Sequence, residues 1–276
     1  MSKPRLRSLI GATLTSATLA AGMLLGAGSA HATAANYVAL GDSYSSGVGT
    51  REYISDGSSC YRSVYAYPYL IKNQTGANLN FQACSGARTY DVSNNQLGAL
   101  SGSTNLVTIS IGGNDAGFAS VITQCAKPWP YTCWQQITDA QNFIRYQLPG
   151  KLDTLYNQIR AKAPYARVVV VGYPRLFNGE ECNFFARISH DEQTALNQTA
   201  DLLASVTAGR ASAHGFPFVD PRSAFTGHAV CDDVEWLNGL SDPILESYHP
   251  NRTGHQAYRS LVQPVLLPAS TYRIAA

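Results

Sequence analysis

The sequence Tyr37-Val38-Ala39-Leu40-Gly41-Asp42-Ser43-Tyr44 joins a short apolar run to a glycine and a serine. Such a run followed by Gly is typical of a β-strand that ends in a tight turn. Ser43 would then stand at the C-terminal end of the strand, the edge where ligands bind in open α/β sheets. Because serine is common in turns, this position makes Ser43 a candidate nucleophile that still needs partners elsewhere in the chain.

Apolar runs of strand length alternate with longer helical patterns along the rest of the chain. Val168-Val169-Val170-Val171 is a continuous β-branched run, as expected for a parallel strand buried on both faces. The alternation predicts right-handed βαβ units and one three-layer α/β/α domain with a central parallel sheet. We expect strands at 37–40, 79–84, 106–111, 168–172 and 216–220, and helices at 64–75, 135–162 and 189–213, the second kinked or split at Pro149-Gly150.

The first residues predict an export signal rather than part of the fold. Lys3, Arg5 and Arg7 precede an apolar, small-residue stretch from Leu9 to Leu25. Two small-x-small cleavage candidates follow, Ala30-His31-Ala32 and Ala32-Thr33-Ala34. We therefore expect a signal peptide at 1–34, a single domain at 35–276, and a secreted, extracellular protein. The apolar stretch falls short of the ~20 strongly apolar residues of a membrane span, so stable membrane insertion is not expected.

Charge and cysteines narrow the class further. Without residues 1–34 the chain keeps 17 of its 20 basic residues and all 18 acidic ones, so no nucleic-acid partner is expected. The six cysteines are an even number and all follow the leader, which favours three disulfides over metal ligands in an exported chain. Of the 15 possible pairings we expect the sequential one: Cys60–Cys84, Cys125–Cys133 and Cys182–Cys231.

Further chemically suggestive residues follow the next expected strands. Cys84-Ser85-Gly86-Ala87 comes after the second strand and Gly112-Gly113-Asn114-Asp115 after the third. In a parallel sheet these C-terminal ends share one edge. The Ser43 and Gly86 backbone N–H groups and the Asn114 side-chain amide could then form an oxyanion hole, the donor set that acyl transfer requires. Asp42 and Asp115 are expected to support these loops by accepting backbone hydrogen bonds.

A serine hydroxyl also needs a base to take its proton, and histidine usually serves. His249 lies in the loop Glu246-Ser247-Tyr248-His249-Pro250, just before the last expected helix. His255 falls inside that helix and is expected to have a packing or surface role. His249 is therefore the candidate base.

These motifs resemble those of the SGNH (GDSL) hydrolase superfamily, and most closely those of secreted actinobacterial lipases and esterases. The resemblance places the nucleophile at Ser43, the oxyanion donors at Gly86 and Asn114, and the base at His249. It implies a flavodoxin-like three-layer fold, three disulfides, and hydrolysis of ester or lipid substrates without a metal or organic cofactor. We take a monomer as the working expectation.

One position departs from the family pattern. The family commonly has Asp three residues before the histidine, where this chain has Glu246. Either the Glu246 carboxylate or the Ser247 backbone carbonyl could orient the imidazole. The sequence does not choose between them.

The sequence therefore predicts a secreted serine carboxylester hydrolase, a lipase or esterase that works through a Ser43 acyl-enzyme. Phospholipase A and acetyl-carbohydrate esterase activities are the neighbouring alternatives. A non-catalytic secreted binding module and a secreted serine peptidase are the alternatives from other classes. Gly-x-Ser-x-Gly, the pattern of a nucleophile elbow, is absent around Ser43, which argues against an α/β-hydrolase fold.

Overall fold

Five parallel strands form the centre of the computed structural model, which describes residues 34–128, 130–182 and 188–268. The strand order is β2-β1-β3-β4-β5. The strands are β1 (Asn36–Gly41), β2 (Asn78–Phe81), β3 (Leu106–Ser110), β4 (Arg167–Val171) and β5 (Phe218–Val219). The described residues group as one compact unit. The expected signal peptide lies outside the described residues, apart from its last position.

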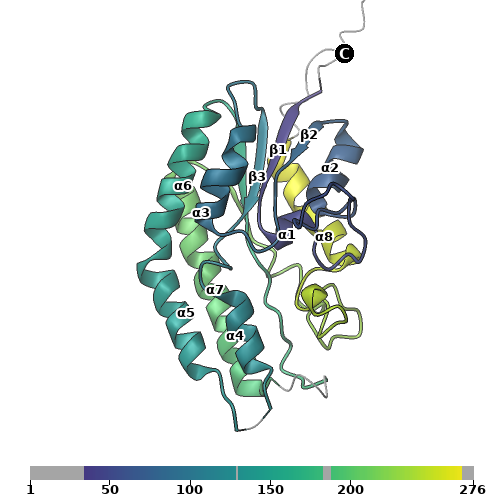
Figure 1. Ribbon diagram of the computed structural model, residues 1–276, viewed down its shortest axis with the longest axis vertical. Helices are drawn as coiled ribbons and strands as arrows, with labels where there is room; N and C mark the ends of the chain where they lie inside the picture. Colours follow the sequence, from purple (N-terminus) through teal and green to yellow (C-terminus); the bar gives the residue numbers. More distant parts are fainter. Residues whose placement is uncertain (1–33, 129, 183–187, 269–276) are drawn as a thin grey trace, which may run out of the picture. The chain divides into compact units, whose positions relative to one another are not determined.

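Helices cover both faces of this sheet (Figure 1). One face carries α2 (Tyr67–Thr75) and α8 (Arg252–Leu266), and the other carries α3 (Thr89–Asp91), α6 (Leu148–Lys162) and α7 (His190–Ala213). The remaining elements are α1 (Ser43–Ser46), η1 (Val92–Gln96), η2 (Leu97–Ala99), α4 (Phe118–Cys125), α5 (Trp134–Tyr146) and η3 (Ile244–Glu246). The predicted three-layer α/β/α fold is confirmed.

Alternate residues of each central strand serve the two faces. In β1, Tyr37 and Ala39 belong to the core on the side of α2 and α8, whereas Val38 and Leu40 belong to the core beneath α6. The valine run of β4 divides in the same way, and all four valines are buried. Both faces of these strands are apolar, which is the reason for their unbroken hydrophobic runs.

Several predicted boundaries differ from the observed ones, and three of these differences lie at or beside a proline. The expected helix 135–162 divides at Gln147 rather than at Pro149-Gly150, because Pro149 fits the first turn of α6, where its missing N–H costs no hydrogen bond. The expected helix 64–75 begins only at Tyr67, with Pro68 in its first turn. The last expected strand, 216–220, shortens to two residues after Pro217.

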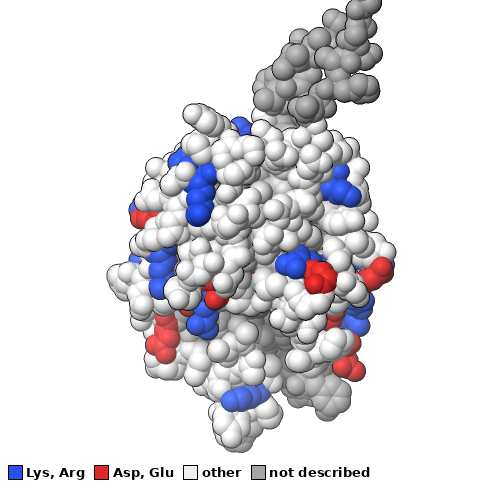
Figure 2. All heavy atoms as spheres, turned by 45° about the horizontal axis from the view of Figure 1, so that its top comes forward, with Lys and Arg blue, Asp and Glu red and all other residues white. Residues whose placement is uncertain are grey.

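Three disulfides join consecutive cysteines, which is the expected sequential pairing: Cys60–Cys84, Cys125–Cys133 and Cys182–Cys231. On the face in Figure 2, acidic and basic side chains are interspersed among uncharged residues. Among the described residues, no helix is both long and apolar enough to cross a membrane.

Candidate active site

Ser43 occupies the first position of α1, directly after β1. The turn depends on Gly41, whose φ is +121° and whose position leaves no room for a side chain, since a Cβ would collide with the Ser110 carbonyl oxygen. Asp42 caps α1 by accepting the Tyr44 N–H at 3.0 Å. The strand and its cap thus present Ser43 at the C-terminal edge of the sheet.

His249 meets Ser43 from the loop that precedes α8. Its Nε2 lies 2.8 Å from Ser43 Oγ, and its Nδ1 lies 2.8 Å from the Ser247 carbonyl oxygen. Because a carbonyl can only accept, Nδ1 carries the proton and Nε2 is free to accept from the serine hydroxyl. Burial lowers the pKa of His249 to about 4, against the opposing effect of the Ser247 hydrogen bond. The imidazole is therefore neutral near pH 7, as a base must be.

The loop that carries His249 is held on both sides. Tyr248 has φ of +60°, and its carbonyl accepts the Tyr44 hydroxyl at 2.7 Å. Asn238 donates its backbone N–H to the His249 carbonyl and a side-chain N–H to the Gly49 carbonyl, each at 2.9 Å. These bonds connect the histidine loop to the segment that follows Ser43.

The Glu246 carboxylate bonds Tyr53 and not His249. It is buried, and its Oε1 accepts the hydroxyl of Tyr53, while Oε2 has no hydrogen-bond partner among the described residues. The group at His249 Nδ1 is the Ser247 carbonyl instead. Of the two alternatives, the geometry favours the carbonyl as the orienting group.

The three expected oxyanion donors follow three neighbouring strands: Ser43 comes after β1, Gly86 after β2 and Asn114 after β3. The Ser43 N–H is at the first position of a helix and has no intrahelical acceptor. Gly86 is exposed with φ of +79°, and a Cβ there would meet nothing within 4 Å, so the space beside it is open. Asn114 uses one amide hydrogen on the Ala87 carbonyl at 3.1 Å, which leaves its second hydrogen available.

The two motif aspartates do support loops, and Asp42 also pairs with Tyr173. Asp115 accepts the backbone N–H and hydroxyl of Thr89 at 2.9 and 2.6 Å. Asp42 accepts the Tyr173 hydroxyl at 2.5 Å, and burial raises the Asp42 pKa to about 7. Tyr173 follows β4 at the same sheet edge, and its position at a strand end is the sequence signal that indicates it.

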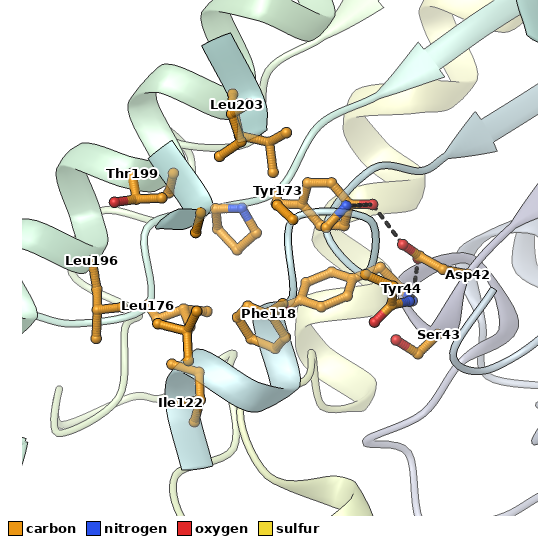
Figure 3. Close-up of a pocket in the computed structure, with 18 residues that line it drawn as sticks. Asp42, Ser43, Tyr44, Phe118, Ile122, Tyr173, Leu176, Leu196, Thr199 and Leu203 are labelled. Atoms are coloured by element: carbon orange, nitrogen blue, oxygen red, sulfur yellow. Dashed lines mark hydrogen bonds between the residues drawn. The ribbon is translucent and has the colours of Figure 1, made fainter. Parts of the chain in front are cut away.

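An apolar pocket opens beside Ser43 and extends between α4, α5 and α7 (Figure 3). Its empty space is about 740 Å³ when the solvent at its open mouth is included, and about 80 Å³ of this can hold the centre of a water molecule. Asp42, Ser43 and Tyr44 lie at one end, and Leu196 and Thr199 lie at the far side. Phe118, Ile122, Leu176 and Leu203 supply apolar walls. The strand-end motifs do not predict these walls, because the walls combine residues of α4, α5 and α7, which only the tertiary structure brings together.

Comparison with known proteins shows the family of this chain. Residues 39–257 match the sequence model of the GDSL-like Lipase/Acylhydrolase family. The chain is 49% identical to Lipase 1 of Streptomyces coelicolor over 249 residues, which cover 87% of this chain and 92% of that protein. Two solved structures are similar, each covering 84% of this chain and 98% of the other. They are the extracellular lipase of Streptomyces rimosus (44% identity, TM-score 0.78) and phospholipase A1 of Streptomyces albidoflavus NA297 (46% identity, TM-score 0.79).

The chain therefore belongs to the GDSL-like lipase/acylhydrolase family and is a carboxylic ester hydrolase. The expected family resemblance is confirmed. In the part of the chain that the structure describes, no group of three or more His, Cys, Asp or Glu could hold a metal ion.

Proposed function

We propose that this protein is a secreted lipase or esterase that cleaves acyl esters through a covalent Ser43 acyl-enzyme. The observation that carries the proposal is the hydrogen-bonded chain from Ser43 Oγ to His249 to the Ser247 carbonyl at the mouth of an apolar pocket. A nucleophile next to a base, with a third group that orients the base, is the arrangement that acyl transfer needs.

In the first half-reaction, Ser43 Oγ attacks the ester carbonyl carbon as His249 Nε2 takes its proton. The N–H groups of Ser43 and Gly86 and the Asn114 amide hold the negative charge of the tetrahedral intermediate. When the intermediate collapses, the bond to the alcohol breaks and His249 returns the proton to the leaving oxygen. Water then attacks the acyl-enzyme with His249 again as base, which releases the fatty acid and restores Ser43.

The pocket favours esters of longer acyl chains over acetyl esters. Its walls are largely apolar, and it extends from Ser43 toward Leu196, so an acyl chain bound along it would be removed from water. We therefore propose acylglycerols and soluble fatty-acid esters as substrates. Phospholipids are the second candidate, because a phospholipase A1 is among the relatives of similar structure.

Three observations support secretion. Residues 1–34 read as a signal peptide, the chain has three disulfides, and the Streptomyces rimosus relative is described as extracellular. We propose that the mature protein begins at Thr33 or Ala35 and acts as a monomer without stable membrane insertion.

The test uses protein collected from the culture medium, with its N-terminus and its mass in solution measured first. A fluorophosphonate should label the wild type once, at Ser43, and should fail to label Ser43→Ala and His249→Ala. Both variants should lose ester hydrolysis by a factor on the order of 10⁴ to 10⁶ while keeping their melting temperatures. Full activity in folded Ser43→Ala would refute the mechanism. p-Nitrophenyl esters of increasing chain length and a phosphatidylcholine, assayed in parallel, separate the substrate classes.

A further inference from the structure

The end of β1 extends beyond one of its neighbouring strands. On one side Gly41 still pairs with Ser110 of β3. On the other side the pairing with β2 ends at Ala39 and Phe81. The backbone of Gly41, two residues before Ser43, therefore has no strand partner on the β2 side.

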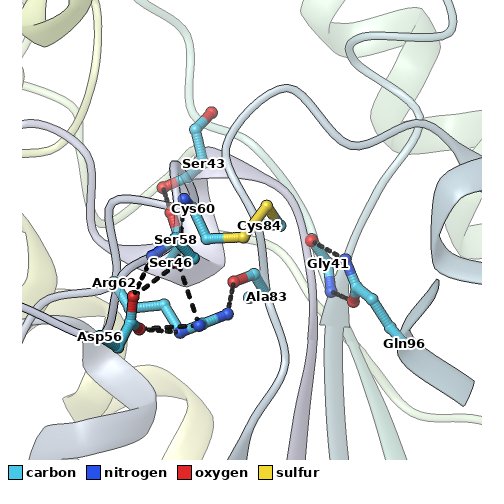
Figure 4. The surroundings of a disulfide bond; sticks show 10 residues. All are labelled: Gly41, Ser43, Ser46, Asp56, Ser58, Cys60, Arg62, Ala83, Cys84 and Gln96. Atoms are coloured by element: carbon cyan, nitrogen blue, oxygen red, sulfur yellow. Dashed lines mark hydrogen bonds and ion pairs between the residues drawn. A yellow bond between two sulfur atoms is a disulfide. The ribbon is translucent and has the colours of Figure 1, made fainter. Parts of the chain in front are cut away.

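The side chain of Gln96 fills this place. Its Oε1 accepts the Gly41 N–H at 2.8 Å, and its Nε2 donates to the Gly41 carbonyl at 2.8 Å, so the amide bonds both backbone groups as a strand would (Figure 4). Gln96 is only 3% exposed. In this buried site, loss of the Gln96 amide would leave the Gly41 N–H without its hydrogen-bond partner.

Gln96 lies in the same stretch of chain as Gly86, one of the expected oxyanion donors. Gln96 ends η1, a π-helical turn that continues from α3, and α3 begins shortly after Gly86. The Gly41 carbonyl also accepts the Cys84 N–H at 3.0 Å. The first and last residues of the segment 84–96 thus both bond the backbone of Gly41. Gly86 lies between these two residues in the sequence.

We propose that Gln96 is a positioning residue for acylation, and that its amide keeps Ser43 Oγ in register with the Gly86 N–H. The inference rests on the proposed role of Ser43. Gln96 does not contact the reacting atoms and acts through Gly41. Small displacements of a nucleophile can lower the rate strongly while leaving the binding pocket intact. The pocket walls come from α4, α5 and α7, so the loss of Gln96 should affect kcat rather than KM.

Gln193 offers a matched control. It is also 3% exposed, and its amide also bonds backbone groups, accepting from Gly179 N–H at 3.0 Å and donating to the Glu180 and Ile188 carbonyls at 2.8 and 2.9 Å. Gln96→Met and Gln193→Met should lower the melting temperature to a similar extent. Only Gln96→Met should lower kcat and the rate of fluorophosphonate labelling, by roughly 10- to 100-fold, with KM for a soluble ester unchanged. Equal kcat in the two variants would overturn the proposal.

Gln96→Glu provides a readout that a purely structural role would not change. A protonated carboxyl can accept from and donate to Gly41 as the amide does, whereas an ionised one cannot donate. The labelling rate relative to wild type should therefore be near one at about pH 5 and should fall as the pH rises toward about 9. The same ratio for Gln193→Glu should stay constant. If Gln96→Met does not fold, a flat Gln96→Glu profile still refutes the inference. Activity in Ser43→Ala, measured alongside, would refute the proposed function instead.

Discussion

The Ser247 carbonyl lies against Nδ1 of His249, the proposed base, in the place where a Ser-His-Asp triad has a carboxylate. A carbonyl fixes the tautomer as a carboxylate does, but it contributes a dipole rather than a full charge. It also does not titrate. Orientation of His249 by this group is therefore insensitive to pH, and if His249 is the base as proposed, we expect its own protonation to limit activity on the acid side.

We predict that Glu246→Gln keeps kcat within about 3-fold of wild type, because its carboxylate bonds Tyr53 rather than His249. Tyr53→Phe, which removes the other half of that pair, should behave in the same way. Steady-state kinetics on a soluble ester measure both, with His249→Ala as the inactive reference. A loss of kcat by a factor of about 100 or more in Glu246→Gln would instead assign Glu246 the role of a triad acid.

At the scale of elements, the strands bring the proposed reacting groups to one edge and the helices shape the apolar pocket beside it. β1 and β3 end next to Ser43 and Asn114, whereas α4, α5 and α7 line the pocket. Because the chemical groups and the pocket walls belong to different elements, acyl-chain preference can change without a change in the reacting groups.

We expect Leu196→Trp to shorten the acyl chain that the enzyme accepts, because Leu196 lies across the pocket from Ser43. Activity on long-chain p-nitrophenyl esters should fall about 10- to 100-fold, while activity on the acetyl ester should change little. Gln198→Trp adds the same bulk at an exposed position of α7 and serves as the control. An unchanged chain-length profile in Leu196→Trp would show that the acyl chain binds elsewhere.

At the scale of the whole molecule, the fully buried His255 and the partly buried His249 couple stability to pH. His255 is fully buried and accepts the Tyr67 N–H at 3.3 Å. Burial, with a smaller contribution from nearby His249, lowers the pKa of His255 to about 3. In the unfolded chain His255 takes up a proton near pH 6.5, whereas in the fold it stays neutral at that pH. Its contribution to stability is therefore fully present above about pH 6.5. The contribution is lost as the pH falls from about 6.5 toward about 3.

His255→Gln should therefore show a smaller fall in melting temperature between about pH 7 and pH 4.5 than the wild type does. His249 has the same sign of shift, so part of the fall should remain. His190→Gln, at an exposed position, should leave the fall unchanged. Thermal unfolding across this pH range tests the prediction, and parallel curves for wild type and His255→Gln would contradict it.

Much of the fold could be predicted from the sequence, because its signals are local. The valine run of β4 and the apolar run of β1 have the length and composition of buried strands, and Ser43, Gly86 and Asn114 follow strands whose ends must share an edge. Boundaries were less accurate, since the position of a proline within a helix turn decides whether the helix stops or starts there.

By itself, then, the sequence determined the three-layer fold, the residues at the sheet edge and the class of enzyme. Only the tertiary structure decided which group meets His249, since Glu246 and Ser247 are both close in sequence and Tyr53, on a distant loop, takes the carboxylate. The pocket walls and the Gln96 amide were invisible for the same reason. They depend on contacts between segments far apart in the chain, whereas sequence patterns report the periodicity and turns of neighbouring residues.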